Sequence, residues 1–282
     1  MMILGQISYT VPDTVDEALA ALAGDETSLP IAGGNGLLTQ LKRGELTTPH
    51  LIDIGRIAEL RGVRVVDEGR LRVGALTTLT DLCIEPVVRT AHMPGVLTDA
   101  VDVTGDVQCR NRATVGGTVA SAHPGSDLSA ALLALDATVC LASPRGRRVV
   151  PAAELFATGG PDRGELIVWV EIGPASPGSA YAKFTDRANL HAVCGVAVAV
   201  TLSADNTIAK AAIAITGALE VPARLSELER SLVGRPLPVT VEVATDLPYV
   251  SSAVSGPEYR AHLATVLAQR AFTSAVQRAQ NA

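Results

Sequence analysis

The sequence is poor in aromatic residues and has no excess of basic ones. Phe, Trp and Tyr together supply 3% of its 282 residues. The cores must therefore be built from Val, Leu, Ile and Ala, which favours sheets covered by helices over an aromatic stacking surface for nucleic acid. Asp and Glu outnumber Lys and Arg by 29 to 23, so the net charge is -6 and no basic stripe is present. These absences exclude a nucleic-acid partner.

Long hydrophobic runs are also missing. No uninterrupted apolar stretch reaches the roughly 18 residues that a bilayer span requires. The start, Met1 to Gly5, has neither the basic segment nor the long apolar core of a signal peptide. We therefore expect no membrane span and a cytoplasmic protein. The length suits two or three domains with cores of their own.

The cysteines are few and form no pair with the spacing of a metal site. Cys83, Cys109, Cys140 and Cys194 lie far apart and include no CxxC motif. Their spacing predicts neither a zinc site nor a complete set of iron–sulfur ligands, so no metal is expected in this chain. Buried, reduced thiols are the expected state.

Helix and strand patterns alternate in the first part of the chain. A capping box at Thr14 to Glu17 begins a helix. Apolar strands are expected at 29–32 and 51–54, with a short helix between them. Alternation at 63–66 and 71–73 then predicts a β-hairpin. Apolar periodicity predicts further helices and strands: helices at 79–83, 87–92, 95–101 and 127–135, and strands at 138–141, 147–150 and 166–172.

A cluster of chain-breaking residues, Pro174 to Ser179, indicates a domain boundary. Beyond it the pattern predicts a meander of three strands followed by two helices, with strands at 180–184, 193–202 and 208–215 and helices at 225–232 and 257–277. We expect three domains: residues 1–58, 59–175 and 176–282.

Two glycine loops are the strongest chemical signal. Gly33 to Gly36 lies between a strand and a helix, where missing side chains let an anion approach backbone N–H groups. Alone, such a loop is more typical of a plain turn, because it matches neither GxGxxG nor a P-loop. The second loop, Thr114 to Thr118, adds two hydroxyls, and Ser121 and Asp127 follow within reach of a ribose or ribityl chain. Two such loops indicate a long ligand that contains a pyrophosphate.

Six segments carry a family resemblance. They are residues 31–38, 51–60, 107–118, 122–127, 181–184 and 255–263. Together they resemble the FAD-binding medium subunit of the molybdenum hydroxylases, a family that includes carbon monoxide dehydrogenase and the flavin part of xanthine dehydrogenase. The likeness covers nearly the whole chain, and the order and separation of the two glycine motifs are specific to it.

The resemblance implies an α+β fold. This is the two-subdomain FAD-binding module of the vanillyl-alcohol-oxidase (PCMH) type, followed by a CO-dehydrogenase-flavoprotein C-terminal domain with a three-stranded antiparallel sheet and helices. It implies FAD as cofactor, with a molybdopterin-binding large subunit and a 2Fe-2S small subunit as partners. The implied function is electron transfer from the iron–sulfur clusters through FAD to NAD, a quinone or dioxygen. The cysteine pattern suits this, because the chain cannot ligate the clusters itself.

The resemblance also implies roles for single residues. Asp127 would bind on the ribityl side, and the backbone of Ile167 or Val168 would complete the ring site. Lys183 would lie near the isoalloxazine ring and stabilise the reduced flavin by its charge, although a solvated lysine at a strand edge is the alternative. The pyrophosphate would be held by the loops, namely Ile31, Ala32, Gly33, Gly34, Asn35, Gly36 and Leu37, and Thr114, Val115, Gly116, Gly117 and Thr118, with Ser121 nearby.

Two segments depart from the family pattern. Asn189-Leu190-His191 stands where relatives commonly have Gly-Asp and an aromatic residue. In the aromatic position His191 would cover the ring or exchange a proton with it, which makes it a candidate catalytic residue beside Lys183; an exposed loop histidine is the alternative. Asn35-Gly36 replaces a polar residue followed by Ser or Asp, so one hydrogen bond to the cofactor is expected to be missing.

Two other functions remain open from the sequence. The first is a stand-alone FAD-dependent oxidoreductase that acts directly on a small organic molecule, with His191 as acid–base group. The second is a redox-inactive binding module that has lost FAD. Neighbouring genes for molybdopterin and cluster subunits would favour the electron-transfer subunit, and a colourless product would favour the binding module.

Overall fold

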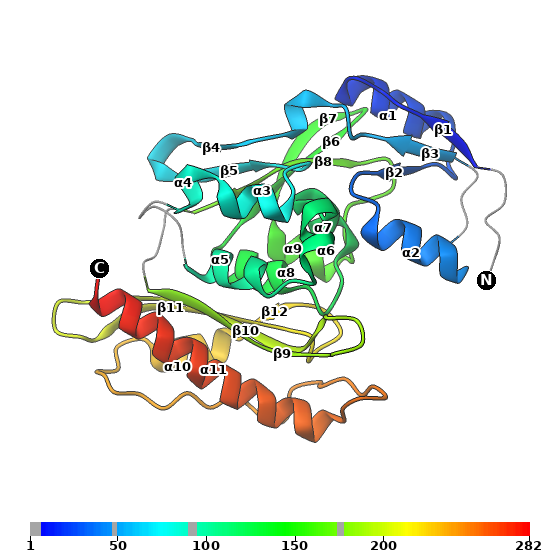
Figure 1. Ribbon diagram of the computed structural model, residues 1–282. Coiled ribbons are helices and arrows are strands. Elements are labelled where there is room, and N and C mark those ends of the chain that lie inside the picture. Colours follow the sequence, from blue (N-terminus) through cyan, green and yellow to red (C-terminus); the bar gives the residue numbers. More distant parts are fainter. Residues whose placement is uncertain (1–6, 47–49, 90–94, 174–177) are drawn as a thin grey trace.

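The protein is α+β and contains three sheets that follow one another along the chain (Figure 1). The computed structural model describes residues 7–46, 50–89, 95–173 and 178–282. None of the helices in these ranges combines the length and the apolarity that a bilayer span requires.

The first sheet is small and parallel, with strand order β1-β3-β2. It contains β1 (Ser8–Thr10), β2 (Leu29–Ile31) and β3 (His50–Asp53), and it is accompanied by α1 (Val15–Gly24) and α2 (Asn35–Arg43). The Thr14 hydroxyl accepts a hydrogen bond from the Glu17 N–H at 3.2 Å, which confirms the predicted start of α1. The strand β1 escaped prediction because three exposed residues carry no apolar pattern.

The second sheet is antiparallel, with strand order β4-β5-β8-β6-β7. The predicted hairpin is confirmed as its first two strands. The strands are β4 (Val63–Val65), β5 (Leu71–Gly74), β6 (Thr138–Ser143), β7 (Gly146–Pro151) and β8 (Leu166–Ile172). One core covers the face toward the helices, and another joins the opposite face to α1 and β3.

Helices of the middle region cover one face of this sheet. They are α3 (Leu79–Ile84), α4 (Pro86–Arg89), α5 (Gly95–Asp102), α6 (Val107–Arg112), α7 (Val115–Ser121), α8 (Asp127–Ala134) and α9 (Ala152–Ala157), with 3-10 turns η1 (Ala58–Leu60) and η2 (Asp67–Gly69). The helix expected at 87–92 is seen as α4, and its predicted end lies outside the described residues. The sequence did not predict α6 or α9, because each has only six residues and too few turns to establish a period.

The third sheet belongs to the C-terminal part and has four strands in the order β12-β11-β10-β9. The sequence predicted three strands in this sheet and missed the fourth. That strand is β12 (Ala223–Arg224), a two-residue edge strand too short to show alternation. The other strands are β9 (Ser179–Thr185), β10 (Ala192–Leu202) and β11 (Ile208–Thr216), followed by α10 (Ser226–Leu232) and α11 (Pro257–Gln280).

The C-terminal sheet lies between two helical layers (Figure 1). Helices α5 and α8 of the middle region pack on one face, and α10 and α11 cover the other. Two partly exposed arginines link the layers: Arg224 pairs with Asp136 at 2.5 Å, and Arg278 pairs with Asp99 at 2.7 Å. The C-terminal sheet also contacts the turn that follows α7, where the Ala192 N–H donates to the Gly125 carbonyl at 3.2 Å.

Candidate functional site

The first glycine loop joins β2 to α2 and ends in a helix N-terminus. Gly34 has a φ of 82°, a left-handed conformation that favours glycine, and it precedes the first helical residue. Within the described residues, the backbone N–H groups of Asn35, Gly36 and Leu37 have no acceptor. Asn35 and Gly36 are exposed. Unpaired N–H groups at the positive end of a helix dipole form an anion-binding site, so this loop suits a phosphate group.

The two glycine loops lie side by side. A Cβ added to Gly33 would stand 1.7 Å from the carbonyl oxygen of Arg112, and the Arg112 Nε–H donates to the Gly33 oxygen at 3.3 Å. The Asn35 amide donates to the Cys109 carbonyl at 3.0 Å. Both contacts fall on α6, which ends at Arg112, with one residue between it and Thr114 of the second loop. Loops 80 residues apart in the chain thus meet through α6.

The second loop uses its backbone N–H groups within the protein. The Val115 N–H donates to Thr77 at 2.9 Å, and the Gly116 N–H donates to Ala75 at 2.8 Å. The Gly117 N–H is capped by the Thr114 hydroxyl at 3.1 Å. A Cβ added to Gly116 would meet Ala75 at 2.6 Å, so this glycine is needed for protein packing. What this loop offers a ligand is an exposed backbone at Gly117 and the nearby hydroxyls of Thr118 and Ser121.

Asp127 and Lys183 form a buried ion pair. Their side chains are 2.8 Å apart and each is 3% exposed. The Asp127 carboxylate also accepts from the Tyr181 hydroxyl at 2.6 Å and the Thr104 hydroxyl at 3.2 Å. Burial raises the pKa of the Asp127 carboxyl, and the Lys183 ammonium opposes that rise. The alternative of a solvated Lys183 is excluded by this burial.

The Lys183 ammonium makes two further hydrogen bonds. It donates to the Val103 carbonyl at 3.0 Å and to the Leu190 carbonyl at 2.8 Å. A lysine ammonium has three N–H donors, and with Asp127 all three are used within the protein. An influence of Lys183 on a flavin would therefore be exerted through its charge or through the residues that it holds.

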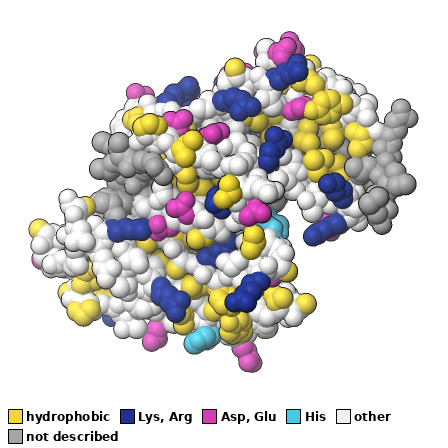
Figure 2. Space-filling model, in the orientation of Figure 1, with side chains coloured by type: hydrophobic (Ala, Val, Ile, Leu, Met, Phe, Trp, Pro, Cys, Tyr) yellow, Lys and Arg dark blue, Asp and Glu magenta, His cyan; other side chains and the backbone are white. Residues whose placement is uncertain are grey.

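His191 stacks on His123. Their ring centroids are 4.1 Å apart with an interplanar angle of 22°. Burial lowers the pKa of both imidazoles, that of His123 to about 4. Figure 2 shows a notch between the part of the molecule that carries α2 and the C-terminal part, with a histidine at its inner end. His191 is exposed, and the charge of Arg43, in the last turn of α2, contributes to lowering its pKa.

Other predicted residues lie around this arrangement. Ile167 and Val168 are buried in β8, against which α7 packs, and the Val168 carbonyl accepts from the Ala75 N–H at 3.0 Å. Ile31 ends β2, and like Ala32 and Leu37 it is half-buried. Their contacts with a cofactor stay predictions, as do those of the loop residues above.

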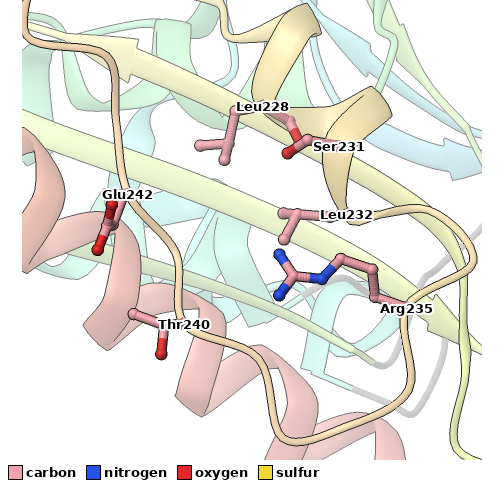
Figure 3. A pocket seen from close by; sticks show the side chains of 6 residues that line it. All are labelled: Leu228, Ser231, Leu232, Arg235, Thr240 and Glu242. Atoms are coloured by element: carbon pink, nitrogen blue, oxygen red, sulfur yellow. The ribbon is translucent and has the colours of Figure 1, made fainter.

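A cavity of about 300 Å³ lies elsewhere, between α10 and the segment after it (Figure 3). Its lining consists of Leu228, Ser231, Leu232, Arg235, Thr240 and Glu242. Because α10 covers the face of the C-terminal sheet opposite to α8, this cavity is separate from the glycine loops.

Comparisons with known proteins agree with this geometry. The model of the FAD binding domain in molybdopterin dehydrogenase matches residues 5–175, and that of the CO dehydrogenase flavoprotein C-terminal domain matches residues 179–275. These matches and the fold define a flavoprotein subunit of an oxidoreductase, with FAD as its cofactor. The chain belongs to the family of FAD-binding medium subunits of the molybdenum hydroxylases, as its resemblance predicted.

Several relatives are similar over nearly their full length. The glyceraldehyde dehydrogenase medium chain of Sulfolobus acidocaldarius is 32% identical, over 95% of this chain and 97% of the relative. The carbon monoxide dehydrogenase medium chain of Hydrogenophaga pseudoflava is 36% identical, over 83% and 82%. The solved carbon monoxide dehydrogenase from Hydrogenophaga pseudoflava superposes with a TM-score of 0.92 at 30% identity, over 98% of this chain and 99% of that chain.

Sequence reasoning missed several residues that organise the site. Tyr181 and Thr104 complete the shell of Asp127, and the Gly125 N–H donates to the His123 ring at 3.1 Å. Arg112 donates to the Gly33 carbonyl and so links α6 to the first loop. Tyr181 stood in a segment that carried the family resemblance, so one signal for it was present.

Proposed function

We propose that this chain receives electrons from the iron–sulfur clusters of a small subunit and passes them from its FAD to NAD, a quinone or dioxygen. A molybdopterin-binding large subunit would oxidise the substrate. The single observation that carries the proposal is the pair of adjoining glycine loops, one of which ends in unpaired helix N–H groups. A cytoplasmic location, expected from the sequence, belongs to the same proposal.

The residues of this chain would bind and orient the cofactor. The N–H groups of Asn35, Gly36 and Leu37 suit the pyrophosphate, and the hydroxyls of Thr118 and Ser121 suit its sugar or ribityl side. When bound, FAD supplies the capacity to take up and release electrons, which no side chain of this set provides. His191 would lie at the ring and keep water from one of its faces.

The alternative of a stand-alone flavoenzyme is less well supported. Two relatives that match over more than nine-tenths of their length are named medium chain and FAD-binding subunit, which are names of components of larger enzymes. Expression with the genes of candidate large and small subunits, followed by affinity purification, tests the assembly. Recovery of a yellow, active single chain that binds neither subunit would overturn it.

Gly36→Glu is expected to weaken FAD binding without unfolding the chain. An added Cβ at Gly36 has no atom within 4 Å, so the side chain is accommodated. A carboxylate in the first helical turn stabilises the helix by about 0.3–1 kcal/mol through its interaction with the helix dipole. It also occupies the expected position of the pyrophosphate and repels the negative charge of that group. We expect FAD affinity at least about tenfold below that of Gly36→Gln, since a tenfold ratio needs only about 1.4 kcal/mol.

The measurement is an FAD titration followed by flavin fluorescence, with circular dichroism to verify folding. Gly36→Gln is the matched control, because it has the same bulk without the charge. Equal FAD affinity in the two variants would show that no anion binds at the start of α2.

A further inference from the structure

The turn between β9 and β10 has a strained backbone. Leu190 has a φ of 62°, in the left-handed region that a leucine rarely adopts. Such a conformation persists only where surrounding contacts over-determine it, and strained residues of this kind concentrate at functional sites. His191, the next residue, carries the imidazole that stacks on His123.

Besides the bond from the Ala188 N–H to the Asp186 carboxylate at 2.9 Å, four hydrogen bonds hold this turn. The Leu190 N–H donates to the Asp186 carbonyl at 2.8 Å, and the Asp186 N–H donates to the His191 carbonyl at 2.9 Å. The Asn189 side chain accepts from the His191 N–H at 2.9 Å. The fourth bond comes from outside the turn: Lys183 donates to the Leu190 carbonyl at 2.8 Å. Lys183 is itself fixed by the buried Asp127, so the turn is tied to the interior.

His123 is held from the other side. Its Nδ1 accepts from the Gly125 N–H at 3.1 Å, which places the proton of the neutral ring on Nε2. The Gly125 carbonyl accepts from the Ala192 N–H at 3.2 Å, directly after His191. The two histidine-bearing turns are therefore linked through backbone bonds as well as through their rings.

The charged groups around the stack are few. Lys183 on β9, Asp186 in the turn itself and Arg43 on α2 act on His191, and His191 acts on His123. Since the two cations and burial oppose protonation of His191, and burial opposes that of His123, both rings are neutral near neutral pH. Two neutral, stacked imidazoles leave the outer face of one ring free for an aromatic ligand.

We propose that Lys183 and Asp127 form a positioning pair: through the Leu190 carbonyl they hold the turn in the conformation that stacks His191 on His123 and presents the outer face of His191 to the flavin. The inference rests on the proposed FAD site. It assigns His123 a role as the support of His191. It also makes the effect of Lys183 on the cofactor indirect.

The first test uses the FAD-free chain. Asp127→Asn combined with Lys183→Met removes the positioning pair, called the clamp below, without leaving a buried charge. Adding Leu190→Asn places at position 190 a residue that tolerates the left-handed region. Histidine C2–H signals are titrated by NMR, with His123→Gln and His191→Gln for assignment. Lys210→Met, at an exposed lysine, is the matched control.

In the double variant we expect the stack to open, so that the proton affinity of His123 rises about tenfold or more toward that of a free histidine, whose pKa is about 6.5. Leu190→Asn in the same chain should return it to within about threefold of the parent, because asparagine needs no clamp to hold a positive φ. The proposed clamp would be overturned if His123 titrates in the double variant as it does in the parent. It would also be overturned if the folded triple variant does not regain the proton affinity of His123 seen in the parent.

The second test measures FAD affinity and the flavin midpoint potential of the same variants. We expect the double variant to bind FAD about tenfold more weakly, as for loss of one stacking partner, and the triple variant to recover. A potential shift that Leu190→Asn leaves uncorrected would mean that Lys183 acts directly by charge, against the inference. If the parent chain binds no FAD while the NMR result holds, the proposed function fails and the clamp stands.

Discussion

Lys183→Met is expected to destabilise the chain by about 3–5 kcal/mol, the cost of removing one partner of a buried ion pair. Asp127 would keep its hydroxyl donors, Tyr181 and Thr104, but lose the charge that balances its carboxylate. The Val103 and Leu190 carbonyls would each lose their bond to the ammonium. Methionine matches the length of lysine, so the effect reports charge and hydrogen bonding more than lost volume.

The loss should depend on pH in a definite direction. Burial already raises the pKa of Asp127, and removing the Lys183 ammonium raises it further. The folded variant then holds a proton that the unfolded chain releases above about pH 4, so its stability falls as the pH rises from there. Urea unfolding at about pH 5 and about pH 8 measures this difference.

Two controls separate the buried pair from a general effect of lysine loss. Lys210→Met removes an exposed lysine and should cost at most about 0.5 kcal/mol. Asp127→Asn combined with Lys183→Met should recover part of the loss, since no lone charge remains buried. Equal losses in the free energy of unfolding for Lys183→Met and Lys210→Met would mean that the buried pair contributes nothing to stability. The sequence-based expectation that the Lys183 charge stabilises the reduced flavin is tested by the flavin potential of Lys183→Met, measured on the folded, FAD-loaded fraction.

Gly33→Ala is expected to separate the two glycine loops and to abolish FAD binding. The added Cβ would lie 1.7 Å from the Arg112 oxygen, and that atom belongs to the backbone and cannot rotate away. Overpacking of this kind costs about 1–3 kcal/mol or more. The bond from Asn35 to the Cys109 carbonyl would be strained as well. From the sequence, the space needed by the pyrophosphate was the expected reason; in the structure the obstacle is α6.

Gly36→Ala is the matched control, since it adds the same methyl group in the same loop with no atom within 4 Å. Thermal unfolding and FAD titration of both variants form the measurement. We expect Gly36→Ala to keep its stability and Gly33→Ala to lose about 2–4 °C in Tm for a 1 to 2 kcal/mol change in a chain of this size. Identical Tm values would show that the loops do not depend on this contact.

The prediction of local structure succeeded where a signal is contained in a few neighbouring residues. The Thr14 cap and the 63–73 hairpin are of this kind, and both are confirmed. It failed for the three-residue β1 and the two-residue β12, because strands so short are formed by pairing with β3 and β11 and have no pattern of their own. The short helix α6 was missed for the same reason, although it proves to be the link between the glycine loops.

The sequence by itself determined the family, the cofactor and the two loops, because glycine positions and their order along the chain are read directly from the residues. Only the tertiary structure decided how these parts work together. The packing of β9 against the start of α8 and the turn before β10 places Lys183 within hydrogen-bond distance of Asp127 and Leu190, and it stacks His191 on His123. The burial that makes Lys183 and Asp127 an obligatory pair is likewise a property of the packed chain, since side chains from separate segments exclude water only after folding.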